Sequence, residues 1–461
     1  MLSLKYDAVK FNNATNKGVN LADKGMTLAI VLLVAGLIVG GGIGYFAAPT
    51  KTVTVQGSST TVIQTVTEAP LKGKTIKLGY IASDTTGLET GKPYHEKIIA
   101  PDMNAWAKTL GYGVTFQYLV DDATGQANVH LEKVQGFKST GVTVFEGGGW
   151  SSQAQAALSY CNTNGMLMWS SSSTSPTLAI ANDNLFRMCT ADTALAPALA
   201  NVMWAAGVKS IVLFQRGDSW GDGIINLLVP IWTAKGGEIA GEKIRYASES
   251  VEFANYLTVA DAQVKTAVAK YGGETQRVGV VILSFNEIAV ICKQVSSFPN
   301  MYNVHWWGSD GTALSQRAMD DAPEEANHIG IYSLLSRQTP TQLYVDLEKR
   351  YIDLTKQQYG TYSAYSYDLT TVIANSMYSA QSTDGKILVP LQAAYSFQLF
   401  GAAGWSKLDQ FGDRAAPPYD VWGFYPGATK ASVSKIMAQY DPDFKVTTFM
   451  TSVLGYTPIG P

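Results

Sequence analysis

Strand-like and helix-like segments alternate along most of this chain. Short apolar runs of strand length at 75–82, 142–145 and 278–283 are each followed by a longer helical segment. This alternation predicts an α/β fold with doubly wound parallel sheets, because parallel strands need long crossover connections. The further strands expected are 114–119, 166–169, 210–214 and 304–307, with an extended segment at 238–246. The helices expected are 92–110, 126–140, 153–164, 221–235, 252–270, 287–297, 341–359 and 366–380.

The composition suits a globular protein that binds neither nucleic acid nor metal. Of the 461 residues 46% are hydrophobic, which is ample for a sizeable core, and the net charge of −3 shows no basic excess. Four scattered histidines and three cysteines show no metal-ligand spacing, although one disulfide among Cys161, Cys189 and Cys292 is possible. There is no P-loop, zinc-protease motif or dinucleotide fingerprint, so we expect no cofactor.

Residues 26–48 form an almost wholly apolar stretch, and no charge occurs between Lys24 and Lys51. At about 1.5 Å per residue, a helix of this length can cross the hydrocarbon core of a bilayer. Lysines outnumber acids before it, so the positive-inside rule places residues 1–25 in the cytoplasm and the rest outside. The sequence therefore predicts a single-pass anchor on the cell membrane with an extracytoplasmic domain.

Two features near this stretch leave alternatives open. Residues 24–27 resemble the processing site of archaeal type IV pilin-like signal peptides, in which cleavage would follow Gly25, although Ile30 stands where those signals usually carry glutamate. Residues 49–73 are rich in Thr, Ser and Val and predict an extended stalk, which is a candidate for O-glycosylation; a β-ribbon is the alternative.

Open parallel sheets bind ligands beyond the carboxyl ends of their strands, so the residues after each strand are the candidates for a site. Strand 142–145 is followed by Glu146 and three glycines, then by Trp150, Ser151 and Ser152 at a helix start, where amides and hydroxyls favour an anion such as a carboxylate. Strand 166–169 is followed by a run of hydroxyls that includes Ser173 and Thr174. An ordinary helix cap and a plain surface loop are the alternatives.

The segment after strand 210–214 allows three interpretations. Residues 217–221 fit the G-x-S-x-G pattern of a hydrolase nucleophile elbow centred on Ser219, but only two histidines follow and no oxyanion segment precedes. Residues 216–218 spell the Arg-Gly-Asp adhesion tripeptide, which occurs often by chance. Trp220 offers an aromatic ring to a ligand across a cleft.

After strand 304–307, Asp310 lies in a Gly-Ser-Asp-Gly turn. An acid at this place pairs well with a ligand ammonium, because charge-assisted hydrogen bonds are about twice as strong as neutral ones. A simple Asp-Gly turn is the alternative.

Taken together and in order, these segments resemble the branched-chain amino acid-type solute-binding proteins of ABC transporters, which have the type I periplasmic-binding fold. The resemblance covers residues 74–425, and its pieces include Gly-Gly-Trp-Ser-Ser at 148–152, Ser-Thr-Ser-Pro at 173–176, Asp-Ser-Trp-Gly-Asp-Gly at 218–223 and Gly-Ser-Asp-Gly at 308–311. It implies that the chain is not an enzyme and that its partners are an ABC permease and its ATPase.

The resemblance also implies roles for single residues. Ser151 and Thr174 match the residues that bind the ligand α-carboxylate, and Asp310 matches the acid that binds the α-ammonium. Trp220 stands where an aromatic residue from the second lobe closes over the ligand. Either Ser284 or Phe285 takes the next pocket position, and Trp150 replaces a residue of modest size, so a remade side-chain pocket is expected. Amino acids, amides and urea remain open as ligands.

The same resemblance predicts two lobes that close around the ligand. We expect lobe one at 74–192 and 336–404 and lobe two at 193–335 and 405–461, joined by a three-strand hinge. A serine hydrolase that uses Ser219 and a surface adhesion or structural protein are the alternative functions.

Overall fold

The computed structural model describes residues 50–57, 60–67, 69–337, 341–415, 418–454 and 456–460. It separates the chain into two units, Met1–Pro70 and Leu71–Pro461. In the first unit β1 (Thr50–Gly57) pairs antiparallel with β2 (Thr60–Thr67), so the segment predicted as a stalk contains a β-ribbon. The predicted membrane helix at 26–48 lies outside the described residues. Within the described ranges no helix is long and apolar enough to cross a bilayer.

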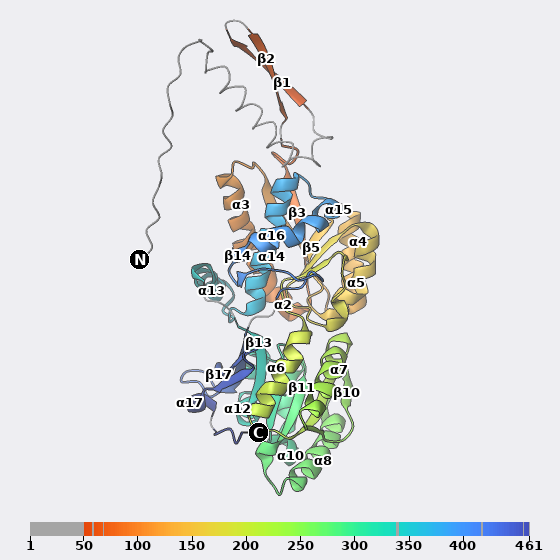
Figure 1. The fold of residues 1–461 in the computed structure, drawn as a ribbon, viewed down its shortest axis with the longest axis vertical. Helices are drawn as coiled ribbons and strands as arrows, with labels where there is room; N and C mark the ends of the chain where they lie inside the picture. The colour runs from red at the N-terminus through yellow and green to blue at the C-terminus, as the bar shows by residue number, and fades with distance from the viewer. Residues whose placement is uncertain are drawn as a thin grey trace, which may run out of the picture. The chain divides into compact units, whose positions relative to one another are not determined.

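In the second unit a five-stranded parallel sheet has the order β4-β3-β5-β6-β7 (Figure 1). Its strands are β3 (Thr75–Ala82), β4 (Thr115–Asp122), β5 (Val144–Glu146), β6 (Leu167–Ser170) and β7 (Leu185–Arg187). The elements around it, which we call the first lobe, are α2 (Thr85–Tyr94), the π-helical turn η1 (His95–Ile99), α3 (Ala100–Thr109), α4 (Ala127–Ser139), α5 (Ser151–Asn164), α13 (Gln342–Thr355), α14 (Thr361–Ala380), α15 (Gly385–Leu388) and α16 (Gln392–Gln398).

Both faces of this sheet are buried, because successive side chains of its strands point to opposite faces. Val144 packs with Leu369 of α14 in one cluster, whereas its neighbour Phe145 packs with Val134 of α4 in another. Successive side chains of a strand point to opposite faces, so a short apolar run without polar alternation is buried on both sides. Helices from two distant parts of the sequence therefore cover the sheet.

The other sheet has nine strands in the order β10-β8-β11-β12-β13-β16-β17-β18, with β9 also paired to β8. Its strands are β8 (Ser210–Gly217), β9 (Glu238–Ile239), β10 (Ile244–Ala247), β11 (Val278–Leu283), β12 (His305–Gly308), β13 (Ile331–Ser336), β16 (Tyr419–Tyr425), β17 (Val433–Asp441) and β18 (Val446–Phe449). The helices of this second lobe are α6 (Asp192–Ala205), α7 (Ser219–Ala234), α8 (Ala254–Lys270), α9 (Ile288–Val295), α10 (Pro299–Tyr302), α11 (Gln316–Asp321), α12 (Pro323–Ile329) and α17 (Thr451–Leu454).

The structure differs from the sequence-based expectation in several places, and it contains elements that were not predicted, among them strands β7 and β13 and helices α6, α11, α12, α15 and α16. The helix expected at 92–110 begins at Thr85 and passes through the π-helical turn η1 before α3. The extended segment at 238–246 is two short strands, β9 and β10. The strands β16, β17 and β18 were not predicted, and they extend the second sheet antiparallel because they follow one another directly.

Three chain segments pass between the two sheets: β7 to α6, β13 to α13, and β15 (Gly404–Trp405) to β16. Residue Arg187 at the end of β7 forms an isolated bridge with Asp413, so two of these segments lie side by side. The lobe boundaries at 192, 335 and 404 stay a prediction. The three cysteines are free and buried, so no disulfide joins them.

Candidate ligand-binding site

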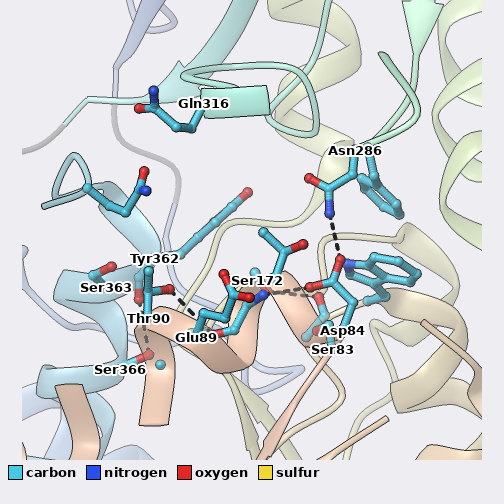
Figure 2. A pocket seen from close by; sticks show the side chains of 18 of the residues that line it. Ser83, Asp84, Glu89, Thr90, Ser172, Asn286, Gln316, Tyr362, Ser363 and Ser366 are labelled. Atoms are coloured by element: carbon cyan, nitrogen blue, oxygen red, sulfur yellow. Dashed lines mark hydrogen bonds between the residues drawn. The ribbon is translucent and has the colours of Figure 1, made fainter. Parts of the chain in front are cut away.

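A cavity of about 730 Å³ lies among loops that follow the carboxyl ends of strands in both sheets. From the first lobe its walls include the β3–α2 and β5–α5 loops, and from the second lobe the loops after β11 and β12. This is where open parallel sheets place their ligands. Figure 2 shows side chains from both lobes around it.

The structure brings five of the eight predicted site residues to this cavity. They are Trp150, Ser151, Trp220, Phe285 and Asp310. Ser152, Ser173 and Thr174 do not line it, and the alternative residue Ser284 does not either. Thr174 instead lines an adjoining cavity of about 10 Å³, room for roughly one water, which it shares with Asp310.

The glycine turn after β5 sets the position of Ser151. The Gly148 N–H donates to Nε2 of His130 at 2.7 Å, and burial lowers the pKa of His130 to about 3, so the ring is neutral and its lone pair can accept. Gly148 has a φ of 60°, and a Cβ there would lie 2.8 Å from Cα of Ala154. Glycine is therefore required for α5 to begin so close to the strand.

Ser151 is tied to the hydroxyl-rich loop after β6. Its Oγ accepts the N–H of Ser175 at 3.1 Å, which leaves the Ser151 hydroxyl proton available to a ligand. Arg187 holds the same loop from the other side, because its Nη1 donates to the carbonyls of Ser173 and Ser175 at 2.8 Å each. These bonds turn Ser173 and Thr174 away from the larger cavity.

Asp310 lies at the boundary of the two cavities. Its Oδ2 accepts the Tyr362 hydroxyl of α14 at 2.5 Å, whereas its Oδ1 is shielded from solvent and makes no hydrogen bond within the described ranges. Burial raises the pKa of Asp310, and the Tyr362 hydroxyl opposes that rise. Burial and then the charge of Asp310 raise the pKa of the nearby Asp192 well above its usual value.

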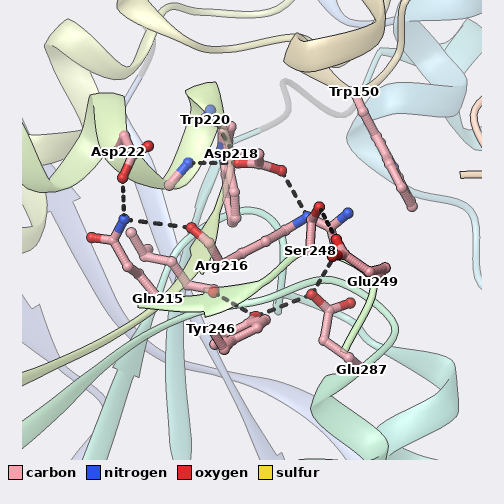
Figure 3. Close-up of polar contacts among 12 residues, drawn as sticks. Trp150, Gln215, Arg216, Asp218, Trp220, Asp222, Tyr246, Ser248, Glu249 and Glu287 are labelled. Carbon is pink, nitrogen blue, oxygen red and sulfur yellow. Dashed lines mark hydrogen bonds and ion pairs between the residues drawn. The ribbon is translucent and has the colours of Figure 1, made fainter. Parts of the chain in front are cut away.

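Three aromatic rings form a stack that joins the lobes. Phe285 stacks on Trp150 of the first lobe at 4.8 Å between ring centroids and on Trp220 of α7 at 4.4 Å. The Arg216 guanidinium lies 4.9 Å from the Trp150 ring and 5.0 Å from the Phe285 ring. Ion pairs of 2.7 Å to Asp218 and Glu287 fix Arg216, as Figure 3 shows.

A direct hydrogen bond also joins the lobes at the cavity wall. Asn286 Nδ2 donates to Oδ2 of Asp84 at 2.6 Å (Figure 2), while Oδ1 of Asp84 caps α2 by accepting the Gly87 N–H at 2.7 Å. The two lobes therefore touch through polar pairs, which include Asp84–Asn286 and Tyr362–Asp310, as well as through the aromatic stack.

Comparison with known proteins assigns the family. Residues 105–426, more than half of the chain, match the model described as "Receptor family ligand binding region". The chain belongs to this family of ligand-binding regions. The resemblance to branched-chain amino acid-type solute-binding proteins of the type I periplasmic-binding fold is thereby confirmed.

Individual relatives of this ligand-binding region are distant in sequence. An uncharacterized protein, MJ1266, of Methanocaldococcus jannaschii is 25% identical over 382 residues, 78% of this chain and 89% of that one. The leucine-binding protein LivK of Thermotoga maritima superposes with a TM-score of 0.65 at 16% identity, covering 80% of this chain and 99% of its own. A solute-binding protein of R. palustris in complex with benzoate gives 0.62 at 17% identity, covering 79% and 96%.

The hydrolase interpretation finds little support in the geometry of the binding region. Ser219 begins α7, and its Oγ is buried and makes no hydrogen bond with any described residue. Of the two histidines that follow it in sequence, His305 stacks on Tyr456 and His328 stacks on Tyr302. The described residues thus hold no Ser–His pair at this turn.

Sequence analysis missed a polar cluster in the binding region. Glu146, at the end of β5, receives the Ser366 hydroxyl at 2.5 Å and contacts Nε2 of His95 at 3.0 Å, and all three line the cavity. His95 begins η1, and π-helical turns are frequent at functional sites. The available signal in the sequence was the acidic residue directly after the apolar run 142–145.

Proposed function

We propose that this chain is an extracytoplasmic solute-binding protein that captures a small zwitterionic or amide solute between its lobes and delivers it to an ABC permease and its ATPase. The observation that carries this proposal is the unpartnered, buried Oδ1 of Asp310 at the cavity. Leaving such an oxygen without a donor is costly, and a ligand ammonium would supply one.

The carboxylate of a zwitterion would also find a suitable binding position in the same cavity. Ser151 is the first residue of α5, where unpaired N–H groups and the helix dipole favour a carboxylate. The Ser151 hydroxyl adds a donor. Thr174 would assist from the adjoining small cavity, on the other side of Asp310.

Lobe closure follows from a ligand that contacts both lobes. Ser151 belongs to the first lobe and Asp310 to the second, so a solute held by both favours the state in which they are close. The aromatic stack and the Asp84–Asn286 hydrogen bond would favour that state as well. The leucine and the benzoate named with the two solved relatives support a small organic solute as the class of ligand.

Asp310→Asn is expected to weaken ligand binding about 30-fold or more, because truncating a buried charge partner costs about 2–5 kcal/mol. A thermal-shift screen of amino acids, amides and urea would find the ligand, and titration calorimetry would measure both variants. Glu324→Gln, an exposed charge change on α12, is the control. Equal affinity of Asp310→Asn and the unchanged protein would contradict the site.

The apolar stretch at 26–48 would hold the binding region at the outer face of the membrane. We expect the native protein either to begin at its first residue and remain membrane-bound or to begin at Met26 after processing. Mass spectrometry of the intact native protein distinguishes the two, and a start beyond residue 48 would contradict both.

A further inference from the structure

The cavity is larger than a single aliphatic amino acid needs. Its volume of about 730 Å³ is in the range of pockets, roughly 300–1,000 Å³, that hold drug-sized ligands. The Ser151–Asp310 corner accounts for an ammonium and a carboxylate only. The residues that line the rest of the cavity therefore indicate the chemistry of the rest of the solute.

Few of those residues have aliphatic side chains. Ile81, Ala313 and Leu314 are the aliphatic side chains that line the cavity, whereas nine serine or threonine hydroxyls do. An aliphatic side chain gains about 25 cal/mol per Å² only when it leaves water for apolar surroundings. A leucine-like side chain would obtain that gain mainly from aromatic rings, which are those of the stack together with Tyr80, Tyr94, Tyr351 and Tyr362.

The charged side chains that line the cavity are mostly acidic. Six carboxylates line the cavity against one guanidinium, Arg317, and one imidazole, His95. Within the described ranges only Glu146 of these acids has an ion-pair partner, and that partner is His95. The carboxylates left without one are those of Asp84, Glu89, Asp310, Asp320 and Asp321.

These acidic residues differ in their exposure to solvent. Glu89, Asp320 and Asp321 are exposed, as is Arg317, and such a rim attracts cations from solution. Asp84 and Asp310 are more enclosed, and burial raises the pKa of each. The positive charge of Arg317 acts on Asp84, but an α-ammonium at Asp310 would still leave the carboxylates of Asp84, Glu89, Asp320 and Asp321 with that one guanidinium.

We propose that the solute carries a second positive charge besides its α-ammonium, held by Asp84 and Glu89, so that a diamino acid or a comparable dication is the preferred ligand class. This inference rests on the proposed binding function. It assigns Asp84 and Glu89 as specificity-determining residues, whereas Ser151 and Asp310 hold the part that all amino acids share.

The test compares L-lysine with L-norleucine, which has the same carbon chain without the terminal ammonium. By titration calorimetry we expect lysine to bind about 10- to 100-fold more tightly, the range of a hydrogen bond to a charged group. The double variant Asp84→Asn plus Glu89→Gln should reduce that preference to about threefold or less. Because the change also disturbs the Asp84–Asn286 hydrogen bond, it should weaken binding of both compounds through lobe closure, so the ratio of the two affinities is the readout. Asp353→Asn, which removes an exposed charge on α13, should keep the preference.

Each alternative result of this binding test contradicts a different part of the proposals. Norleucine binding as tightly as lysine would overturn the second charge and leave the proposed function standing. Binding of 1,4-diaminobutane without any amino acid would keep the cationic ligand and overturn the carboxylate site at Ser151. If none of the three compounds binds in calorimetry or thermal shift, the second positive charge is overturned. The proposed function is overturned only if the wider screen of amino acids, amides and urea finds no ligand either.

Discussion

Replacing Asp413 by alanine should lower the free energy of unfolding by about 3–5 kcal/mol, because the change leaves a buried arginine charge without its partner. Arg187 and Asp413 are 0% and 2% exposed and form two hydrogen bonds of 2.5 Å. The same guanidinium holds the loop that contains Ser175, whose N–H reaches Ser151. We therefore expect weaker ligand binding in addition to the loss of stability.

Urea unfolding followed by circular dichroism measures this effect. Asp353→Ala is the matched control, since its ion pair with Lys349 is 65% and 77% exposed and such pairs contribute about 0–1 kcal/mol. If both variants unfold at the same urea concentration, the buried pair does not have the role assigned to it. Should the Asp413 variant fail to fold, Asp413→Asn, which keeps one acceptor for Arg187, should recover part of the stability.

Trp150→Ala should weaken ligand binding by roughly 30-fold through the equilibrium between open and closed lobes. The indole stacks on Phe285 and faces Arg216, and an aromatic pair and a cation–π contact together are worth about 2 kcal/mol. Those contacts exist only when the lobes are close. Since apparent affinity scales with the closed, competent fraction, the loss appears in Kd.

Calorimetry and small-angle scattering on the same samples test this prediction. The variant without ligand should be more expanded than the unchanged protein, and Trp150→Phe, which retains a ring, should restore most of the affinity. Trp405→Ala removes a half-exposed indole that contacts Phe397 and should change neither quantity. An unaltered Kd and radius of gyration in Trp150→Ala would refute the aromatic contact as part of closure.

The sequence predicted most of the parallel strands from their apolar runs, but it did not predict β7 and β13. In β11 every side chain is buried, so a plain apolar run marks the strand without any alternation. The strands β16 to β18 mix polar and apolar residues and pair with one another antiparallel, and no such run marks them. His95, which begins the π-helical turn, contacts Glu146, 51 residues away along the chain, and no local pattern expresses that contact.

The residues of the candidate site that lie in the segments after strands were predictable from the sequence. Trp150, Ser151, Phe285 and Asp310 stand directly after strands, and the structure places them on one cavity. The side chains contributed by α14 were not predictable. Tyr362 and Ser366 of α14 reach the cavity from more than 50 residues beyond Asp310, through the return of the chain to the first sheet.

The carboxyl groups of Asp192 and Asp310 also affect the stability of the protein when no solute is bound. Both carboxyl groups are removed from water, and the negative charge of Asp310 disfavours ionisation of Asp192. An amine bound at Asp310, as proposed above, would offset this negative charge and stabilise the folded chain. Ligand binding and folding would then be coupled through the same interaction, so removal of the ligand should lower the melting temperature.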